Sequence, residues 1–245
     1  MKTFRNALRL GLSLIVVAML VMVAASPARA QGNPNPGVIP NGTQYERLAA
    51  QWWQWALSFP AAEVPFFNTG GAIDLSVGQS GHVWFLAGAN NGLTEPRTGE
   101  IPTGTSLFFP VANLLNDYPC PPEFGFEPGP GETLEQFLQR TGNEFLDFFL
   151  SDPSELSATV DGVALTGVPN YRVTSSLFKF TADPALSAIF DPCITGERQD
   201  AVTVGYWLLL APLPPGEHTI HFEAGGLFNQ DVTYVITVVP GRRAN

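Results

Sequence analysis

Two aspartates and one histidine are the residues of this sequence best placed for catalysis. Asp117 and Asp200 each border an aromatic, apolar stretch rather than a run of solvated residues. Glycosidases use two carboxyl groups on either side of the bond they cleave. His218 could serve as a general base if Asp117 or Asp200 oriented its ring. The sequence therefore allows a carboxylate-based hydrolase of neutral polysaccharides, against the alternative that these acids are simply solvated.

The sequence predicts no metal site and no cofactor. His218 and His221 lie three residues apart in one predicted strand, so they point to opposite faces and would share a metal only if the strand were bulged. We expect one imidazole in the core and the other exposed. The chain contains no H-E-x-x-H, Walker A or G-x-G-x-x-G motif and no D-x-D-x-D calcium loop.

Tryptophans are the clearest indication of a ligand site. Three of the five fall within residues 52–55. Aromatic faces stack on sugar rings and on apolar ligands, since a large rigid surface gives contact at little entropic cost. Trp53 and Trp55 could converge with Trp84 and Trp207 on a carbohydrate or an apolar small molecule. The alternative is that the helix buries most of them against a sheet and leaves only Trp53 partly exposed.

The two cysteines, Cys120 and Cys193, both lie in proline-containing loops. In an oxidising compartment such a pair predicts a disulfide, which would stabilise the fold by roughly 4 kcal/mol because it closes a long loop. A metal-binding or nucleophilic pair is the weaker alternative, because neither cysteine belongs to a C-x-x-C motif.

Residues 1–30 have the pattern of a signal peptide. A positively charged start with Lys2 and Arg5 precedes an apolar run over residues 10–25, and an A-x-A cleavage site ends at Ala30. A membrane anchor is the alternative, but the run falls short of the roughly 20 residues that span a bilayer. We expect cleavage, a secreted or periplasmic location and no remaining membrane span.

The charge balance narrows the possible partners. The 245 residues include 12 basic and 22 acidic side chains, for a net charge of −10. Residues 1–30 hold four of the basic and none of the acidic residues, so cleavage leaves 8 basic against 22 acidic residues, a net charge of −14. Such a surface repels phosphate, which argues against nucleic acid and acidic membranes as partners. The oligomeric state cannot be predicted from the sequence.

Two helices are expected to accompany the strands. Residues 31–42 form an extended leader rich in Gly, Pro and Asn. Capping-box patterns that begin at Thr43 and at Thr133 predict helices near residues 43–58 and 133–150, each with apolar residues at helical spacing.

The remaining segments predict a single β-rich domain over residues 43–245. Strands are expected at residues 82–87, 105–111, 156–165, 171–180, 202–210, 217–223 and 232–239. Asp161-Gly162 predicts a hairpin turn, and the last three strands are spaced like antiparallel neighbours. We therefore predict a mainly β fold, an antiparallel two-sheet sandwich of jelly-roll or immunoglobulin-like type with two accessory α-helices.

Four segments in the same order resemble a family of uncharacterised secreted bacterial and archaeal proteins. They are Trp52-Trp53-Gln54-Trp55, the VWFLAG stretch at residues 83–88, the IPTGTSLFFP stretch at residues 101–110 with Asn113, and the PLPPGEHTI stretch at residues 212–220. The resemblance implies a secreted β-rich domain and names no substrate. Members of the family tend to carry extra cysteines near residues 75–79 and Arg97, so a local bridge is expected to be missing here.

The sequence thus favours a secreted, non-catalytic binding or structural protein with a tryptophan-lined site for a carbohydrate or an apolar ligand. The hydrolase is the alternative. A third interpretation is a packing module of a surface assembly, whose leader docks on a neighbour's sheet edge.

Overall fold

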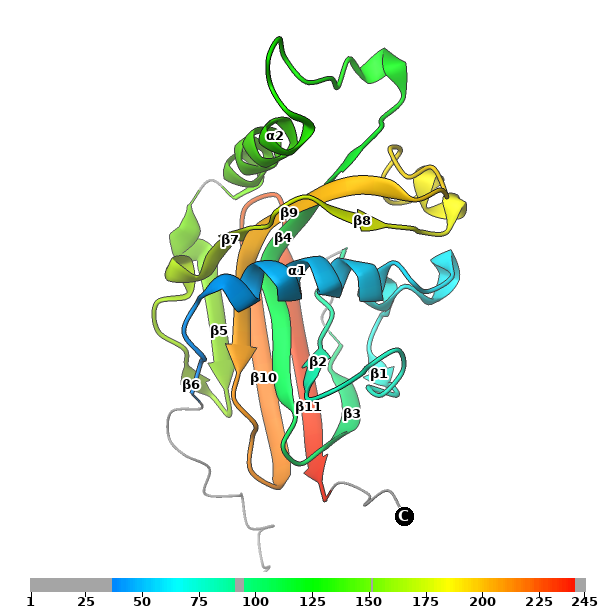
Figure 1. Ribbon diagram of the computed structural model, residues 1–245. Helices are drawn as coiled ribbons and strands as arrows, with labels where there is room; N and C mark the ends of the chain where they lie inside the picture. The colour runs from blue at the N-terminus through cyan, green and yellow to red at the C-terminus, as the bar shows by residue number, and fades with distance from the viewer. Residues whose placement is uncertain (1–36, 91–94, 151, 241–245) are drawn as a thin grey trace, which may run out of the picture.

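The computed structural model describes residues 37–90, 95–150 and 152–240. The predicted signal peptide and residues 31–36 of the predicted leader lie outside these ranges. Within them, eleven strands form two sheets, accompanied by two α-helices (Figure 1). The predicted mainly β sandwich with two helices is confirmed.

The first sheet is built around two long strands. Its order is β2 (Val83–Phe85), β4 (Ser106–Tyr118), β9 (Gln199–Leu210) and β7 (Arg172–Thr174), and β8 (Phe178–Phe180) pairs with another part of β9. β4 and β9 are antiparallel, with a register shift between Pro110 and Ala112. β2 runs parallel to β4 and pairs only with residues 106–108. From Phe109 onward, this edge of β4 has no paired strand in the described part of the chain.

The second sheet faces the first across the main core. Its order is β1 (Gly71–Ala72), β3 (Arg97–Pro102), β11 (Gln230–Val239), β10 (Gly216–Ala224), β5 (Leu156–Val160) and β6 (Val163–Ala164). β3 is parallel to both β1 and β11. Both sheets are therefore mixed, and the prediction of purely antiparallel sheets is wrong. The reason is that β3, which lies between β2 and β4 in sequence, belongs to the second sheet. β4 then re-enters the first sheet in the same direction as β2.

The last three strands do not form the predicted row of antiparallel neighbours. β10 and β11 pair along their whole length, from Gly216 opposite Val238 to Ala224 opposite Gln230. β9 lies in the other sheet, and residues 211–215 carry the chain across. A five-residue connection suits a hairpin and a corner between two sheets equally well, so its length does not distinguish them.

Local turn and capping predictions gave mixed results. The Asp161-Gly162 turn joins β5 to β6 with φ angles of 53° and 77°, as expected for a hairpin turn. α2 (Leu134–Phe149) begins with the predicted capping box, in which the Thr133 hydroxyl accepts from the Gln136 amide and the Gln136 side chain accepts from the Thr133 amide. Short 3₁₀ turns occupy Ala61–Glu63, Pro65–Phe67, Pro122–Phe124, Pro153–Glu155, Val168–Tyr171 and Pro184–Ala188.

The capping box predicted at Thr43 does not form. α1 (Thr43–Ala56) begins one residue earlier than a Thr43 cap requires, with Gly42 at the N-cap and no side-chain cap. The preceding chain is fixed to the end of β9, where the Ile39 amide donates to the Leu209 carbonyl at 2.8 Å. This attachment sets where the chain leaves the sheet and enters the helix.

Two apolar layers hold the elements together. One lies between the sheets, where Phe109 stacks on Phe222 with ring centroids 4.8 Å apart. The other lies between the outer face of the first sheet and α1, which crosses β4 and β9 in Figure 1. α2 packs against β4 and β9 farther along the same strands. No helix among the described residues is long and apolar enough to cross a membrane.

Candidate functional site

The four tryptophans predicted to bind a ligand do not line one common cavity among those described: Trp53 and Trp55 line different ones. Trp207 is fully buried and stacks on Phe108 with ring centroids 5.2 Å apart. Trp84 is half-buried and packs against the core between the sheets, on the opposite face from α1. Trp53 is 4% exposed and its Nε1 donates to the Thr203 hydroxyl at 2.8 Å. The expectation that Trp53 would be the exposed member is wrong, because it points into the sheet.

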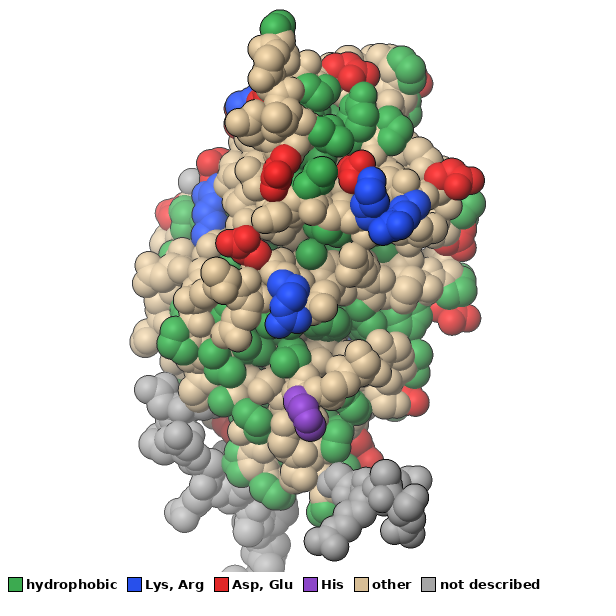
Figure 2. Space-filling view, in the orientation of Figure 1, with side chains coloured by type: hydrophobic (Ala, Val, Ile, Leu, Met, Phe, Trp, Pro, Cys, Tyr) green, Lys and Arg blue, Asp and Glu red, His purple; other side chains and the backbone are tan. Residues whose placement is uncertain are grey.

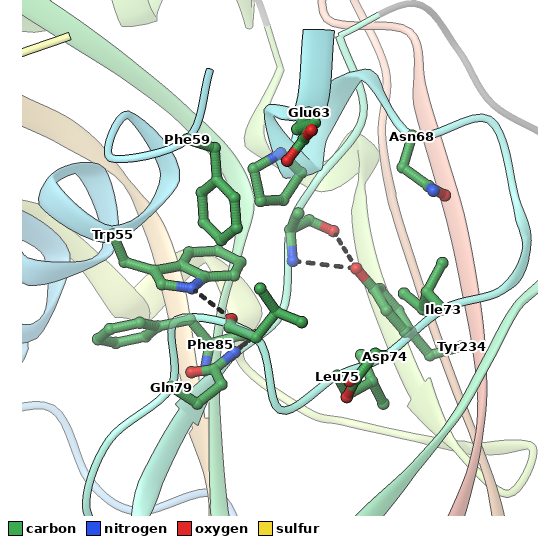
Figure 3. Close-up of a pocket in the computed structure, with 13 residues that line it drawn as sticks. Trp55, Phe59, Glu63, Asn68, Ile73, Asp74, Leu75, Gln79, Phe85 and Tyr234 are labelled. Atoms are coloured by element: carbon green, nitrogen blue, oxygen red, sulfur yellow. Dashed lines mark hydrogen bonds between the residues drawn. The ribbon is translucent and has the colours of Figure 1, made fainter. Parts of the chain in front are cut away.

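Trp55 is only partly buried and lines a small separate pocket of about 210 Å³ (Figure 3). Its Nε1 donates to the Val77 carbonyl at 3.3 Å. The Gln79 side chain accepts from the Phe85 amide at 2.9 Å and donates to the Phe85 carbonyl at 2.8 Å. These polar groups are already paired with the protein, so they have a structural role in this pocket.

Asp117 and Asp200 do not form the predicted carboxylate pair. Asp200 lies opposite Tyr118 in the β4–β9 ladder, whereas Asp117 lies opposite Ala201. Because directly opposite residues share a face and successive residues alternate, the two aspartates point to opposite sides of the sheet. Asp200 instead accepts from Lys179 Nζ at 2.7 Å.

His218 is held in place by the protein. Its ring is buried, with Nδ1 at 2.7 Å from Asp161 Oδ2 and Nε2 at 2.9 Å from the Pro214 carbonyl. The carboxylate beside it is therefore Asp161 and not Asp117 or Asp200. His221 lies on the outer face of the second sheet with its side chain 28% exposed, which confirms the expected opposite placement of the two histidines.

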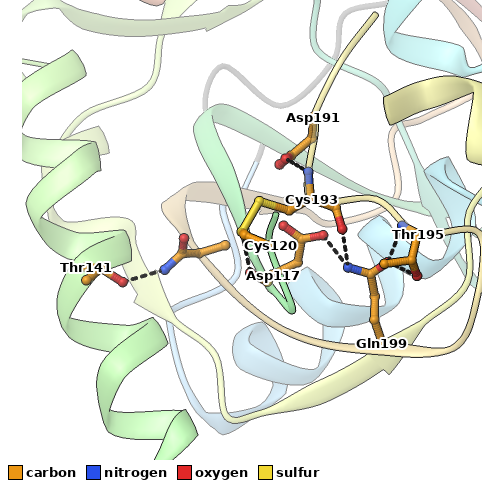
Figure 4. Close-up of a disulfide and its surroundings, with 8 residues drawn as sticks. Asp117, Cys120, Thr141, Asp191, Cys193, Thr195 and Gln199 are labelled. Atoms are coloured by element: carbon orange, nitrogen blue, oxygen red, sulfur yellow. Dashed lines mark hydrogen bonds between the residues drawn. A yellow bond between two sulfur atoms is a disulfide. The ribbon is translucent and has the colours of Figure 1, made fainter. Parts of the chain in front are cut away.

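A disulfide joins Cys120 to Cys193, as predicted, and it brings two aspartates together (Figure 4). Asp117 precedes Cys120 by three residues, and Asp191 precedes Cys193 by two. Asp117 is 2% exposed, and its Oδ2 accepts from Gln199 Nε2 at 2.7 Å. The two cysteine sulfurs beside Asp117 are bonded to each other, so they offer no thiolate to a metal ion.

The surroundings raise the pKa of both carboxyl groups. Burial is the main cause that raises the pKa of Asp117 to about 8, and the nearby charge of Asp191 raises it further. Burial also raises the pKa of Asp191, while hydrogen bonds from the Cys193 amide and from Asp117 act in the opposite direction. Asp117 therefore holds its proton near neutral pH, because two adjacent carboxylates in a buried site cannot both ionise at low cost.

An aromatic cleft runs past this pair. It consists of two adjoining cavities of about 370 and 350 Å³. The cavities share Leu114, Leu115, Phe149 and Asp191. The first is also lined by Trp52, Trp53, Phe66, Gly88, Ala89, Asn90, Asn113, Phe190, Leu227, Phe228 and Gln230, and the second by Asn116, Asp117, Cys120, Phe124, Phe126, Phe145, Pro192 and Cys193.

β4 supplies the floor of the aromatic cleft. Asn113, Leu115 and Asp117 alternate along the strand, so their side chains point to the same face, the one that α1 covers. Asn113 lies opposite Gly205 of β9. A Cβ at residue 205 would lie 2.5 Å from the Ala112 carbonyl oxygen and 2.7 Å from the Asn113 Cβ. Only glycine therefore fits beside Asn113.

Most polar groups at the first cavity are paired with the protein. Gln230 accepts from the Ala89 amide at 2.8 Å and donates to the Val111 carbonyl at 2.6 Å. The Asn90 amide donates to the Phe66 carbonyl at 3.1 Å. The Asn113 side-chain nitrogen, by contrast, is shielded from solvent and has no hydrogen-bond partner among the described residues. A buried donor without a partner is costly, which marks it as a place where a ligand could bind.

Sequence reasoning identified Asp117 but not its partner Asp191. A signal was present, because the predicted disulfide already implied that the residues just before Cys120 and Cys193 lie close together. Phe190 and Phe228 could not be found in this way, since they reach the aromatic cleft from separate loops.

The comparisons with known proteins leave the function to be inferred from this geometry. The site combines two neighbouring aspartates with raised pKa values, phenylalanine walls and an asparagine amide without a partner in residues 37–90, 95–150 and 152–240. The resemblance noted from the four sequence segments stays a prediction. The chain matches no protein-family model, no curated protein and no solved structure.

Proposed function

We propose that this chain is an exported, non-catalytic binding protein whose aromatic cleft takes a small apolar molecule with one hydrogen-bond acceptor. The two cavities, at about 370 and 350 Å³, have the size of small-molecule sites. The disulfide supports an extracytoplasmic location, since such bonds persist in oxidising compartments.

The accessible walls favour an apolar ligand over a carbohydrate. Trp52 and Trp53 are at most 4% exposed, so the surface available to a ligand comes mainly from Phe149, Phe190 and Phe228, which are half-buried. Phenyl rings offer contact area but no polar group to pair with the hydroxyls of a sugar. Apolar side chains also gather where α2 meets the segment that follows β4, on the face shown in Figure 2.

The observation that carries the proposal is the Asn113 amide. Its nitrogen is buried, lacks a hydrogen-bond partner in the described part of the chain and belongs to a residue that lines the first cavity. A ligand carbonyl, ether or hydroxyl oxygen would satisfy it. The acidic chain and the adjacent Asp191 disfavour an anionic ligand, so the expected ligand is neutral.

The test is a fluorescence titration with prodan, 6-propionyl-2-(dimethylamino)naphthalene, a neutral apolar probe whose carbonyl oxygen can accept from the Asn113 amide. Phe149 lines both cavities, whereas Phe148 is 70% exposed and lines neither. Phe149→Ala should weaken probe binding about tenfold or more, because it removes buried aromatic contact. Phe148→Ala is the matched control on the same helix and should bind like the wild type. Equal probe affinities in Phe149→Ala and Phe148→Ala would mean that the probe binds outside the aromatic cleft.

Hydrolysis is the second candidate, favoured by the raised pKa values of the neighbouring Asp117 and Asp191. A glycosidase places its two carboxyl groups on either side of the bond it cleaves, whereas Asp117 and Asp191 affect each other's pKa. They instead fit a dyad that activates one water molecule. This candidate therefore keeps Asp117 from the sequence-based hypothesis and replaces Asp200 with Asp191.

Dye-linked neutral polysaccharide and dye-linked protein are suitable substrates for this second candidate. Asp117→Asn and Asp191→Asn should each abolish dye release, while Asp200→Asn should leave it unchanged because Asp200 pairs with Lys179 on the other face. If both Asp117→Asn and Asp191→Asn still release dye, or if the wild type releases none, the dyad is not a catalyst.

A further inference from the structure

Three metal-ligating side chains meet on the outer face of the second sheet, away from the aromatic cleft. His221 and Glu223 are two residues apart on β10, so they point to the same face. Asp231 of β11 lies directly opposite Glu223 in the ladder. The strands β10 and β11 thus place an imidazole and two carboxylates side by side without any contribution from a loop.

The distances allow all three groups to reach one ion. His221 Nε2 lies 2.9 Å from Asp231 Oδ1 and 3.3 Å from Glu223 Oε1. One ligand atom from each residue lies within 4.8 Å of the others. The side chains are 28%, 51% and 47% exposed for His221, Asp231 and Glu223, so solvent and an incoming ion can reach them.

The two carboxylates of this cluster need a positive charge beside them. Glu223 and Asp231 are directly opposite across an antiparallel pair, where like charges destabilise the sheet. In the described ranges, no lysine or arginine lies within ion-pair distance of either carboxylate. His221 is the one cationic group that can lie between them, and it carries a charge only when protonated.

We propose that His221, Glu223 and Asp231 bind a zinc ion. Zinc takes one imidazole nitrogen and two carboxylate oxygens at about 2.0 to 2.2 Å and completes a tetrahedron with water. Calcium and magnesium prefer sites made only of oxygen, so the imidazole selects against them. Ser157 of β5 is a positioning residue, because its hydroxyl donates to Glu223 Oε2 at 3.2 Å and leaves Oε1 facing His221.

Titration calorimetry of the tag-free full chain with zinc chloride tests this site. The wild type should bind one equivalent, and His221→Ala and Asp231→Asn should lose that binding. Ser157→Ala should bind about tenfold more weakly, as expected when a group that orients a ligand is removed. His82→Ala is the matched control, because His82 is exposed and lies outside the cluster, and it should keep the wild-type affinity.

Circular dichroism spectra of all variants should match that of the wild type, since the substituted side chains are exposed or half-buried. Cobalt in place of zinc should give the absorption of a tetrahedral site in the wild type and not in His221→Ala. No zinc binding by the wild type, or the same affinity in His221→Ala and His82→Ala, would overturn the proposal. Neither result would bear on the aromatic cleft, whose probe binding is measured without metal.

Discussion

Asp117 keeps its proton near neutral pH because the fold buries it beside a second carboxyl group. Its surroundings include the Gln199 amide, the Cys120–Cys193 disulfide and Asp191. The sequence could indicate Asp117, since it ends an apolar run, and it could indicate the disulfide. It could not show that Asp200 points away, because that depends on the register between β4 and β9.

The raised pKa of Asp117 makes stability depend on pH in a defined direction. An unfolded aspartate loses its proton near pH 4, whereas burial raises the pKa of Asp117 to about 8. Between these values the folded chain holds a proton that the unfolded chain has lost. The free energy of unfolding therefore falls as pH rises, by up to about 1.4 kcal/mol per pH unit for one proton.

Asp117→Asn should remove this dependence, because the amide has a similar size but cannot ionise. Urea denaturation near pH 5 and near pH 8 measures it: the wild type should lose more stability than the variant over this interval. The comparison within each protein cancels any constant effect of the substitution. An equal loss in both proteins would show that Asp117 does not hold the proton.

At the scale of elements, periodicity predicted α1 and α2 well because each buries one apolar face. β3 was missed because its sequence, Arg-Thr-Gly-Glu-Ile-Pro, looks polar, and only Arg97 and Ile101 of this strand are buried. The Arg97 guanidinium is accommodated by carbonyls, among them that of Ala87 at 2.7 Å, and by the Tyr234 hydroxyl. Such a strand is identified by its partners, which single-sequence patterning does not reveal.

The close approach of β4 and β9 at Gly205 should be sensitive to one added methyl group. Gly205→Ala places a Cβ 2.5 Å from the Ala112 carbonyl oxygen, so the backbone must shift. We expect a loss of about 1 to 3 kcal/mol in the free energy of unfolding, together with weaker probe binding because Asn113 moves.

Gly37→Ala is the matched control for this substitution, since a Cβ at residue 37 meets nothing within 4 Å. It should change stability by less than about 0.5 kcal/mol. Chemical denaturation of the two variants decides the question. A Gly205→Ala protein as stable as Gly37→Ala would mean that the two strands are not packed this closely.

At the scale of the whole molecule, the sequence predicted the class of fold but not the path of the chain. Mixed sheets arise because β2 and β4 lie in one sheet with β3 of the other sheet between them in sequence. The connection from β9 to β10 likewise crosses between sheets. Alternating apolar residues fix which face of a strand is buried, but the sheet to which it belongs depends on long-range pairing.

The disulfide links two parts of the chain that are distant in sequence, and its removal should lower the stability of the whole fold. Cys120 and Cys193 are 73 residues apart in sequence. Replacing both with serine should lower the free energy of unfolding by about 4 kcal/mol, because the unfolded chain gains freedom. The variant should also bind the apolar probe more weakly, since Cys193 holds Asp191 beside the aromatic cleft. Unchanged urea denaturation would contradict a stabilising role for this bond.

The side-chain amide signals of Asn113 and Gln79 in nitrogen-15 NMR spectra test the central claim most directly. Asn113 lines the aromatic cleft and lacks a partner, while Gln79 lines the separate pocket beside Trp55 and is already bonded to Phe85. Saturating prodan, whose carbonyl can accept from Asn113, should shift the Asn113 signal strongly and leave that of Gln79 in place. A shifted Gln79 signal with an unmoved Asn113 signal would contradict binding in the aromatic cleft.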